Sequence, residues 1–459
     1  MTRLLVAAAL AVSACAAPAA VTTTTAPVPR TEPVAPVTTA AAPIEVVVQG
    51  CSSPPVTFSP LCETYQLLET WHVDAPLDPD SLASVALQGL EGLRTDQVEE
   101  PPRTLFCSIP HEAFSGLCDE LARQVTESQI PVGLGVETAM THMIDAGLDP
   151  FTYYVPPDQA GTIRLNGIVG GVGVLLDSRD AVGSKCAQIS GACRLEIVVV
   201  LEDNAGFDAG LAPGDIVVSV DGVPVEGMGF GAVVAAIAGD ETGFVRLGVE
   251  RDGSAIDFEI ERRELVVPTV ELGLPLDDVA YLRIPDFEDD VPRLVDDALA
   301  ELADTDPGTL VLDLRDNPGG YVDAVVEVAD QFVDDGVVMV SDAPDDHFEY
   351  EATAGGAALH PRLVVLVNEG TASAAEVLAG ALRDRRDAVI VGTSTFGKDA
   401  VQIPFVLRNG GELHVAVARW STPDGDTVGD GGLSPDREVI WPSGITVEEV
   451  VEIALQAAP

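Results

Sequence analysis

Two residues in the C-terminal part of the chain have side chains suited to nucleophilic catalysis, a serine at 373 and a lysine at 398. Lys398 is one of two lysines in 459 residues, and arginine supplies the other 22 of the 24 basic side chains. An arginine guanidinium stays protonated in proteins, whereas a buried lysine amine can lose its proton. Lys398 is therefore a candidate general base, and the alternative is a chance survivor in an arginine-rich composition.

Ser373 lies where a predicted strand meets a predicted helix. The segment LVVLVNEGTASAAEVLAGALRD, residues 363–384, is typical of a buried strand, a tight turn and a helix that opens near Thr371. Unsatisfied N–H groups and the helix dipole favour negative charge at a helix start, which suits a serine nucleophile. Serine is also a common helix cap, and the Gly-x-Ser-x-Gly elbow of many hydrolases is absent. The competing nucleophile Ser394 stands one residue too far from Lys398 for a Ser-x-x-Lys motif.

The elements around these residues predict an α/β core over residues 266–459. Strand-like runs (VAYLRI, TLVLDL, RLVVLVN, AVIVG) alternate with helical ones (VPRLVDDALAEL, YVDAVVEVADQFV, SAAEVLAGALRD). Such alternation indicates helices packed on a mainly parallel sheet. One of the strands, in LVLDLRDNPGG at residues 310–320, ends in a Pro-Gly-Gly turn.

Residues 164–265 have the pattern of a small β-rich module. Short strands and one helical run, GFGAVVAAIAG, are separated by turn residues. The pieces GGVGVLL and AGFDAGLAPGDIVVSVDGVPV resemble a PDZ domain, which accepts a peptide C-terminus. Closely spaced glycines let backbone N–H groups converge on a carboxylate, and the strand that follows can pair with an extended peptide. The predicted peptide-binding residues are Gly170, Gly171, Val172, Gly173 and Val174.

The N-terminal part predicts an export signal, a tether and a helical region. Residues 1–14 hold one arginine and a short apolar run, and VSAC at 12–15 resembles a bacterial lipobox in which Cys15 is lipidated. A plain cleaved signal peptide is the alternative. Residues 15–44 are rich in Pro, Thr and Ala and are typical of an extended linker. Residues 45–163 carry apolar positions at helical spacing and predict a helical region.

The other six cysteines predict disulfides. An even number of cysteines in an exported chain favours disulfides over free thiols, and no His-rich or Cys-x-x-Cys spacing supports the competing reading of metal binding. They fall into three couples that are close in sequence, although other pairings are open. The predicted pairs are Cys51 with Cys62, Cys107 with Cys118, and Cys186 with Cys193.

The charge balance argues against nucleic acid as a partner. The chain has 74 acidic and 24 basic residues, a formal charge of -50, and so repels phosphate backbones. We see no cluster of metal ligands, and we expect no cofactor.

Three motifs in this order behind a PDZ-like module, DLRDNPGG, NEGTASAAE and TSTFGKDAVQ, resemble those of the C-terminal processing peptidases, or tail-specific proteases. The similarity extends to LDPFTYYVPP at 148–157 and to ARWSTPDGDTVGDGGLSPDREV at 418–439, so it covers roughly residues 60–440. The resemblance implies a multidomain α/β fold with a helical N-terminal region, a β-rich PDZ domain and an α/β protease core.

The resemblance also implies roles for individual residues. Ser373 would be the nucleophile, Lys398 the general base and Gln402 the group that orients the lysine. The family usually has glycine after the lysine, and a carboxylate at Asp399 would raise the pKa of Lys398 unless it points away. The backbone N–H groups of Gly319 and Ala374 would form the oxyanion hole. Three side chains would support the site, those of Asp313, Arg315 and Glu376.

These readings predict an exported, lipid-anchored serine endopeptidase that cleaves proteins near their C-terminus. Its partners would be proteins or peptides with free C-termini, the membrane through the lipid anchor, and an activating or adaptor protein. It would lie outside the cytoplasm, facing outward or into a periplasm. One alternative is a catalytically silent PDZ protein that holds peptide tails at the cell surface. Another is an enzyme that acts on cell-wall peptides.

Overall fold

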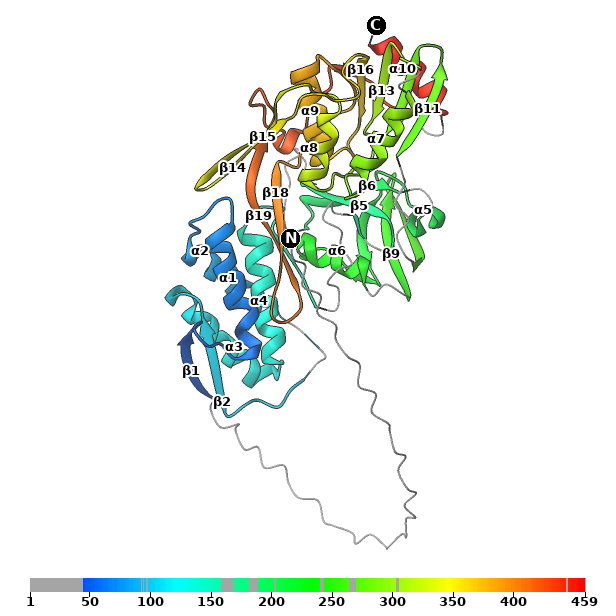
Figure 1. Cartoon of the computed structure of the whole chain (residues 1–459). Coiled ribbons are helices and arrows are strands. Elements are labelled where there is room, and N and C mark those ends of the chain that lie inside the picture. Colours follow the sequence, from blue (N-terminus) through cyan, green and yellow to red (C-terminus); the bar gives the residue numbers. More distant parts are fainter. Residues whose placement is uncertain are drawn as a thin grey trace, which may run out of the picture. The chain divides into compact units, whose positions relative to one another are not determined.

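The computed structural model describes residues 44–458, except 92, 94, 96–97, 158–167, 170, 181–188, 202–203, 240–242, 264–269, 303–304 and 443–444. Figure 1 shows the elements in chain order. The predicted signal peptide, Cys15 and the linker lie outside the described residues.

The described residues of the helical region form four α-helices and a small sheet that its sequence did not predict. Phe58, Leu61 and Leu121 are among the large apolar side chains fully buried in its core. Two short strands pair in parallel, with Val48 opposite Cys107. The elements are β1 (Glu45–Gly50), α1 (Ser59–Trp71), α2 (Pro79–Glu91), β2 (Thr104–Ile109), α3 (Ser115–Ser128) and α4 (Val132–Gly147).

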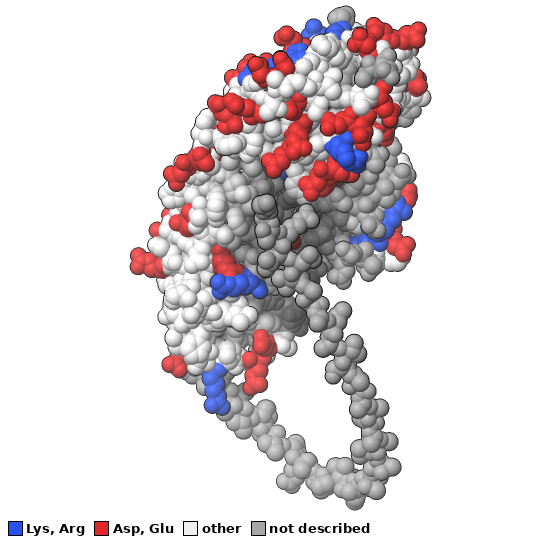
Figure 2. All heavy atoms as spheres, viewed as in Figure 1, with Lys and Arg blue, Asp and Glu red and all other residues white. Residues whose placement is uncertain are grey.

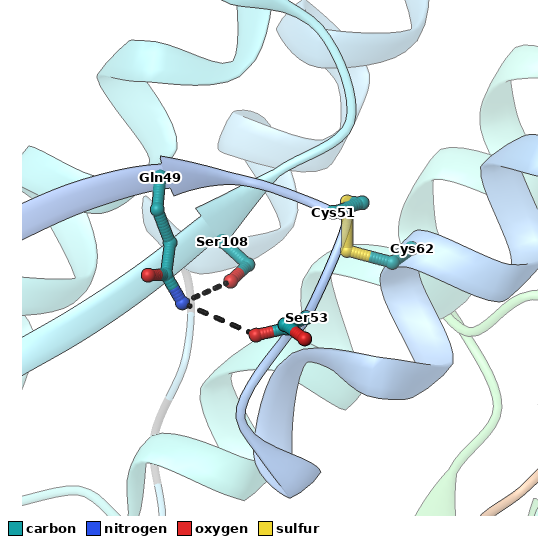
Figure 3. Close-up of a disulfide and its surroundings, with 5 residues drawn as sticks. All are labelled: Gln49, Cys51, Ser53, Cys62 and Ser108. Carbon is teal, nitrogen blue, oxygen red and sulfur yellow. Dashed lines mark hydrogen bonds between the residues drawn. A yellow bond between two sulfur atoms is a disulfide. The ribbon is translucent and has the colours of Figure 1, made fainter.

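Two of the predicted disulfides fasten this small sheet to the helices. Cys51 follows β1 and bonds to Cys62 of α1, and Gln49 Nε2 donates to Ser108 Oγ at 3.2 Å beside it (Figure 3). Cys107 of β2 bonds to Cys118 of α3. Both pairings are confirmed. Cys193 is also disulfide-bonded, but Cys186 lies outside the described residues, so that pairing stays a prediction.

The described part of the β-rich module forms a seven-stranded sheet and two α-helices. The strand order is β10-β9-β7-β6-β5-β4, with β8 paired to β7. Val233 and Ile237 of its longer helix are fully buried against the sheet. The elements are β4 (Ile168–Val169), β5 (Val174–Asp180), β6 (Cys193–Val200), α5 (Ala205–Ala209), β7 (Ile216–Val220), β8 (Val223–Pro224), α6 (Phe230–Ala238), β9 (Gly243–Arg251) and β10 (Ser254–Arg262).

The C-terminal core contains the predicted parallel sheet. Its order is β11-β12-β13-β16-β17-β20, and each pair from β12 to β20 is parallel. One face packs on α7, α8 and α9, and the other packs on α10. The elements are β11 (Glu271–Leu276), β12 (Val279–Arg283), α7 (Val291–Leu302), β13 (Thr309–Asp313), α8 (Val322–Asp330), β16 (Arg362–Val367), α9 (Ala374–Arg386), β17 (Val389–Gly392), β20 (Arg437–Glu438) and α10 (Val447–Ala457).

A second sheet, not predicted from the sequence, stands beside the first. Its order is β15-β14-β19-β18, and β3 from the end of the helical region pairs with β19. Leu407, Leu413 and Val415 of the β18–β19 hairpin pack into the core of the helical region. The strands are β3 (Tyr153–Val155), β14 (Gly336–Ala343), β15 (Asp346–Ala352), β18 (Ala400–Val406) and β19 (Glu412–Ser421).

The surface carries the excess of acidic residues. Figure 2 shows Asp and Glu spread over one face, with few Lys and Arg among them. None of the helices in the described part of the chain has the length and apolar run needed to cross a bilayer.

Candidate active site

Three loops meet at the carboxyl ends of neighbouring parallel strands, where α/β sheets place their ligand sites. They follow β13, β16 and β17 and carry Asn317, Ser373 and Lys398. Hydrogen bonds join the loops: Ala372 N–H donates to Asn317 O at 2.9 Å, and Phe396 N–H donates to Thr371 O at 2.9 Å. The fold therefore brings together the three motifs identified in the sequence.

Ser373 has an unusual backbone conformation immediately before α9. Its φ is +53° and its ψ is -119°, a region that side chains other than glycine rarely occupy. Non-glycine residues are held there only when the surrounding structure compensates the cost, of order 1–3 kcal/mol. The strand end and the helix start thus present Ser373 at the sheet edge, as the sequence pattern predicted.

Glu376 links the backbone of Ser373 to the loop that carries Lys398. It is fully buried, and its Oε2 accepts from Ser373 N–H at 2.8 Å and from Lys398 N–H at 2.9 Å. Its Oε1 accepts from Gly397 N–H at 2.7 Å and from the Thr395 hydroxyl. Burial raises the pKa of Glu376, although these four hydrogen bonds act in the opposite direction. One carboxylate therefore fixes both chain segments.

Lys398 shares a hollow of about 570 Å³ with Ser373. Burial lowers the pKa of Lys398 to about 8, although the charge of Glu376 raises it. Phe396 lines a second hollow with Lys398 and is 8% exposed. Ile403 is 39% exposed, because it lies on the edge strand β18. Ser394 is exposed.

Asp399 is turned toward Arg419. Its carboxylate oxygens lie 3.4 Å from Arg419 Nη1, and its backbone oxygen accepts from Trp420 N–H at 2.9 Å. The charge that raises the pKa of Lys398 is that of Glu376. The structure thus favours the arrangement in which Asp399 points away from the amine.

Gln402 lies on β18 and lines both hollows together with Lys398. Its Nε2 donates to the backbone oxygen of Phe151, in the segment between α4 and β3. This contact joins residues 251 positions apart, which no local sequence pattern could reveal. The side chain therefore stands beside the lysine that it was expected to orient.

The two predicted oxyanion donors lie next to Ser373 but differ in their surroundings. A Cβ added to Gly319, whose φ is +101°, would lie 2.8 Å from Ser373 Cβ and 3.0 Å from Ala374 N. The Gly319 N–H donates to Asn317 Oδ1 at 2.8 Å, so an incoming oxyanion must compete with that oxygen. Ala374 begins α9, where the first N–H groups have no acceptor within the helix.

Asp313 and Arg315 form a supporting pair at the end of β13. Asp313 is fully buried; its Oδ2 lies 2.6 Å from Arg315 Nη2 and accepts from the Tyr281 hydroxyl at 2.8 Å. The guanidinium also stacks over the Trp441 ring, with 4.7 Å from Cζ to the ring centroid. These contacts fix the start of the loop that carries Gly319.

The β-rich module contributes one wall of the second hollow, about 670 Å³ in volume. Residues from β5 and α6 face Ala372, Phe396, Lys398 and Gln402 across it. The wall differs from the predicted peptide-binding set, because the lining begins after Val174, at Leu175, Leu176, Asp177 and Ser178. The backbone oxygens of Val172 and Gly173 accept from Gly206 N–H and Leu201 N–H, and Gly170 lies outside the described residues, so the peptide-binding role of this segment stays a prediction.

The sequence did not single out His72, Asp149 or His414 as site residues. His72 is buried, the Asp149 side chain is 7% exposed, and a 2.7 Å hydrogen bond joins them. His414 is buried and stacks on Tyr153, with ring centroids 4.5 Å apart. Burial, together with the charge of Lys398, lowers the pKa of His414 to about 4. Across the described ranges, no three His, Cys, Asp or Glu side chains gather where they could hold a metal ion.

A parallel sheet with a serine at a helix start and a half-buried lysine, beside a PDZ-like module, defines a serine-type peptidase of α/β fold. Residues 278–439 match the model of peptidase family S41, and residues 196–251 match that of the PDZ domain. The carboxyl-terminal-processing protease of Synechocystis sp. is 30% identical over 331 residues, which are 70% of this chain and 75% of that protein. The chain therefore belongs to peptidase family S41, and to its carboxyl-terminal-processing proteases with a PDZ domain.

Two other comparisons agree with this assignment. The carboxy-terminal processing protease CtpA of Bacillus subtilis is 29% identical over 311 residues, 67% of this chain and 64% of that protein. The solved structure of the photosystem II D1 C-terminal processing protease aligns with a TM-score of 0.63 at 24% identity. That alignment covers 88% of this chain and 98% of the other, and it supports the fold.

Proposed function

We propose that the chain cleaves proteins near their C-terminus by an acyl-enzyme mechanism in which Ser373 is the nucleophile and Lys398 the base. The observation that carries the proposal is the shared hollow of Ser373 and Lys398, with both backbones held by Glu376. At pH 7 a lysine of pKa about 8 is neutral in about one molecule in ten, against about one in three thousand at pKa 10.5. Burial thus supplies a usable base.

The chemical steps follow from these groups. Neutral Lys398 Nζ takes the hydroxyl proton of Ser373 as Oγ attacks the scissile carbonyl carbon. The negative charge develops on the carbonyl oxygen, which Ala374 N–H and, once released from Asn317, Gly319 N–H stabilise. The C–N bond breaks, and Lys398 gives its proton to the leaving amine. Water then attacks the ester, with Lys398 again as base, and frees Ser373.

The β-rich module supports the capture of substrate tails. Its β5 and α6 line the hollow that also reaches Lys398 and Gln402. An extended peptide that enters between a strand and a helix of a PDZ domain adds to the sheet through its backbone. We propose that tails bound there run toward Ser373.

The first fourteen residues support export and anchoring. The apolar run before Cys15 and the Pro/Thr/Ala-rich segment after it fit a lipoprotein on a flexible tether outside the cytoplasm. Mass spectrometry of the mature N-terminal peptide, isolated from the native membrane, tests this part alone. A lipid-modified Cys15 supports it, and an unmodified N-terminus elsewhere contradicts it.

The activity test uses the full-length chain and an unfolded protein substrate over a pH series. Products are identified by mass spectrometry beside Ser373→Ala, Lys398→Ala and the matched control Ser394→Ala. We expect fragments lost from the C-terminal side with wild type and with Ser394→Ala, and none with the other two variants. Cleavage that survives Ser373→Ala would refute the assignment of the nucleophile.

A second candidate is a peptide-binding protein without catalysis. The hydrogen bond from Gly319 N–H to Asn317 favours it, because one oxyanion donor is occupied. Intact substrate at every pH, from protein that is folded by circular dichroism and binds peptide tails, would support this candidate over the peptidase.

A further inference from the structure

Asp149 organises the segment that connects the helical region to the active site. Its side chain is 7% exposed, and both carboxylate oxygens accept hydrogen bonds. Oδ1 accepts from Phe151 N–H at 2.7 Å, and Oδ2 accepts from the Thr152 hydroxyl at 2.7 Å and from His72 Nε2 at 2.7 Å. Burial raises the pKa of Asp149, but hydrogen bonds from His72 and Thr152 outweigh it, so the pKa is lowered. The turn is therefore built around a carboxylate.

His72 is held in one tautomer at the end of α1. Its Nδ1 accepts from Asp74 N–H at 3.0 Å, so the ring proton lies on Nε2 and is donated to Asp149. The adjacent backbone is clamped to β19, because Val73 N–H donates to Ala416 O at 2.8 Å. Ala416 N–H in turn donates to Thr152 Oγ1 at 3.1 Å. The position of the turn is thus fixed from two sides.

The turn presents the Phe151 carbonyl to Gln402. A carbonyl oxygen only accepts hydrogen bonds, so the amide atom that faces it must be Nε2. The amide orientation is thereby determined, and Oε1 is the atom left to accept from other groups. Because Gln402 lines the same two hollows as Lys398, Oε1 is placed to accept a hydrogen bond from the lysine amine. An amine held in this way keeps its lone pair for Ser373.

We propose that Asp149, with His72, is a positioning residue that acts through the Phe151 carbonyl to set the orientation of the Gln402 amide and hence of Lys398. The inference rests on the proposed Ser373 and Lys398 chemistry. It gives the helical region a part in catalysis, since His72 and Asp149 lie in that region while Gln402 lies in the second sheet of the core.

A double-mutant cycle tests the proposal in the full-length chain. Asp149→Ala and Gln402→Ala are each expected to lower kcat by about 10- to 100-fold, the usual cost of a misplaced reacting group, with a smaller change in KM. If Asp149 acts through Gln402, the double variant is no slower than Gln402→Ala alone. A merely structural effect would instead multiply with that of Gln402→Ala.

The matched control is Asp215→Asn in the β-rich module. Asp215 is fully buried; like Asp149 it accepts from a backbone N–H, and it pairs with Arg251 at 2.5 Å. Asp215→Asn can change kcat by any factor. In the double variant Asp215→Asn/Gln402→Ala, the fold-change in kcat should equal the product of the two single fold-changes. All rates are measured below the unfolding transition of each variant, and Asp149→Asn replaces Asp149→Ala in the cycle if the alanine variant does not fold.

The outcomes separate this inference from the proposed function. Activity that survives Ser373→Ala or Lys398→Ala would overturn the proposed chemistry. If Ser373→Ala and Lys398→Ala are both inactive, but the Asp149 and Gln402 substitutions lower kcat by factors that multiply in the double variant, only the positioning role is overturned. We expect that Asp149→Ala adds no further loss of kcat to Gln402→Ala, whereas the fold-change from Asp215→Asn multiplies with that from Gln402→Ala.

Discussion

Asp145 of α4 carries a carboxyl group whose burial makes the stability of the fold depend on pH. The residue is 6% exposed, and a Cβ added to Gly229 at the start of α6 would lie 1.5 Å from its Oδ2. Burial raises the pKa of Asp145 from 3.8 to about 7. The carboxyl group therefore favours its neutral form where the helical region packs on the PDZ domain.

The sign and size of the effect follow from linkage. The folded state binds the Asp145 proton more tightly than the unfolded state does. The contribution of this carboxyl group to the free energy of unfolding is therefore full below pH 3.8 and is lost above about pH 7. About three pKa units correspond to about 4 kcal/mol in total, of which about 3 kcal/mol falls between pH 5 and pH 8. Asp145→Asn keeps the shape and removes the ionisation. The free energy of unfolding of Asp145→Asn, measured relative to that of wild type, should therefore rise by about 3 kcal/mol between pH 5 and pH 8.

Urea unfolding followed by circular dichroism at pH 5, 6, 7 and 8 measures this difference. Hydrogen exchange of α4 and α6 shows whether the change is local to their contact, because a chain of several domains need not unfold in one step. Asp119→Asn on α3, an exposed carboxylate, is the control and should give a constant difference. A constant difference for Asp145→Asn as well would refute the reasoning.

Three further predictions concern the active site. The wild-type kcat/KM should rise with pH through one ionisation near 8, and Lys398→Arg should be inactive at every pH because a guanidinium stays protonated. Gly319→Ala should lower kcat by about tenfold or more, because the new methyl group would lie 2.8 Å from Ser373 Cβ and because the Gly319 φ of +101° is strained for alanine. Measuring kcat and the thermal midpoint together separates this effect from a loss of stability. Glu376→Gln should cost about 1–3 kcal/mol of stability in urea unfolding, because an amide N–H₂ replaces an oxygen that accepts two hydrogen bonds; unchanged stability would contradict the role of Glu376.

The parallel core was predictable because each of its elements is encoded locally. Strands buried on both faces are continuous apolar runs, as in residues 310–312 and 363–367, and the helices between them have their own periodicity. The position of Ser373 followed from the junction of one such strand with one such helix. The two confirmed disulfides each join cysteines only 11 positions apart.

Most of the rest depends on contacts between distant segments. His72 meets Asp149 across 77 positions and Phe151 meets Gln402 across 251, so neither pair has a periodic signature. The second sheet was missed for the same reason, since β14–β15 and β18–β19 are two separate insertions between strands of the parallel core, and β3 comes from the helical region. The hydrogen bond of Gly319 to Asn317 was missed because a Pro-Gly-Gly turn predicts a bend but not the acceptor of its N–H.

The hollow lined by β5, α6 and Lys398 would set the distance between the bound end of a substrate and the bond that the proposed enzyme cleaves. A tail bound there as proposed would run past Lys398 and Gln402 toward Ser373, and each extended residue would cover about 3.3 Å. The cut would then be placed by counting back from the end of the substrate, and not by reading the residues at the cleaved bond. Substrates with unrelated tails would lose pieces of similar length, and a tail shorter than the path would escape cleavage.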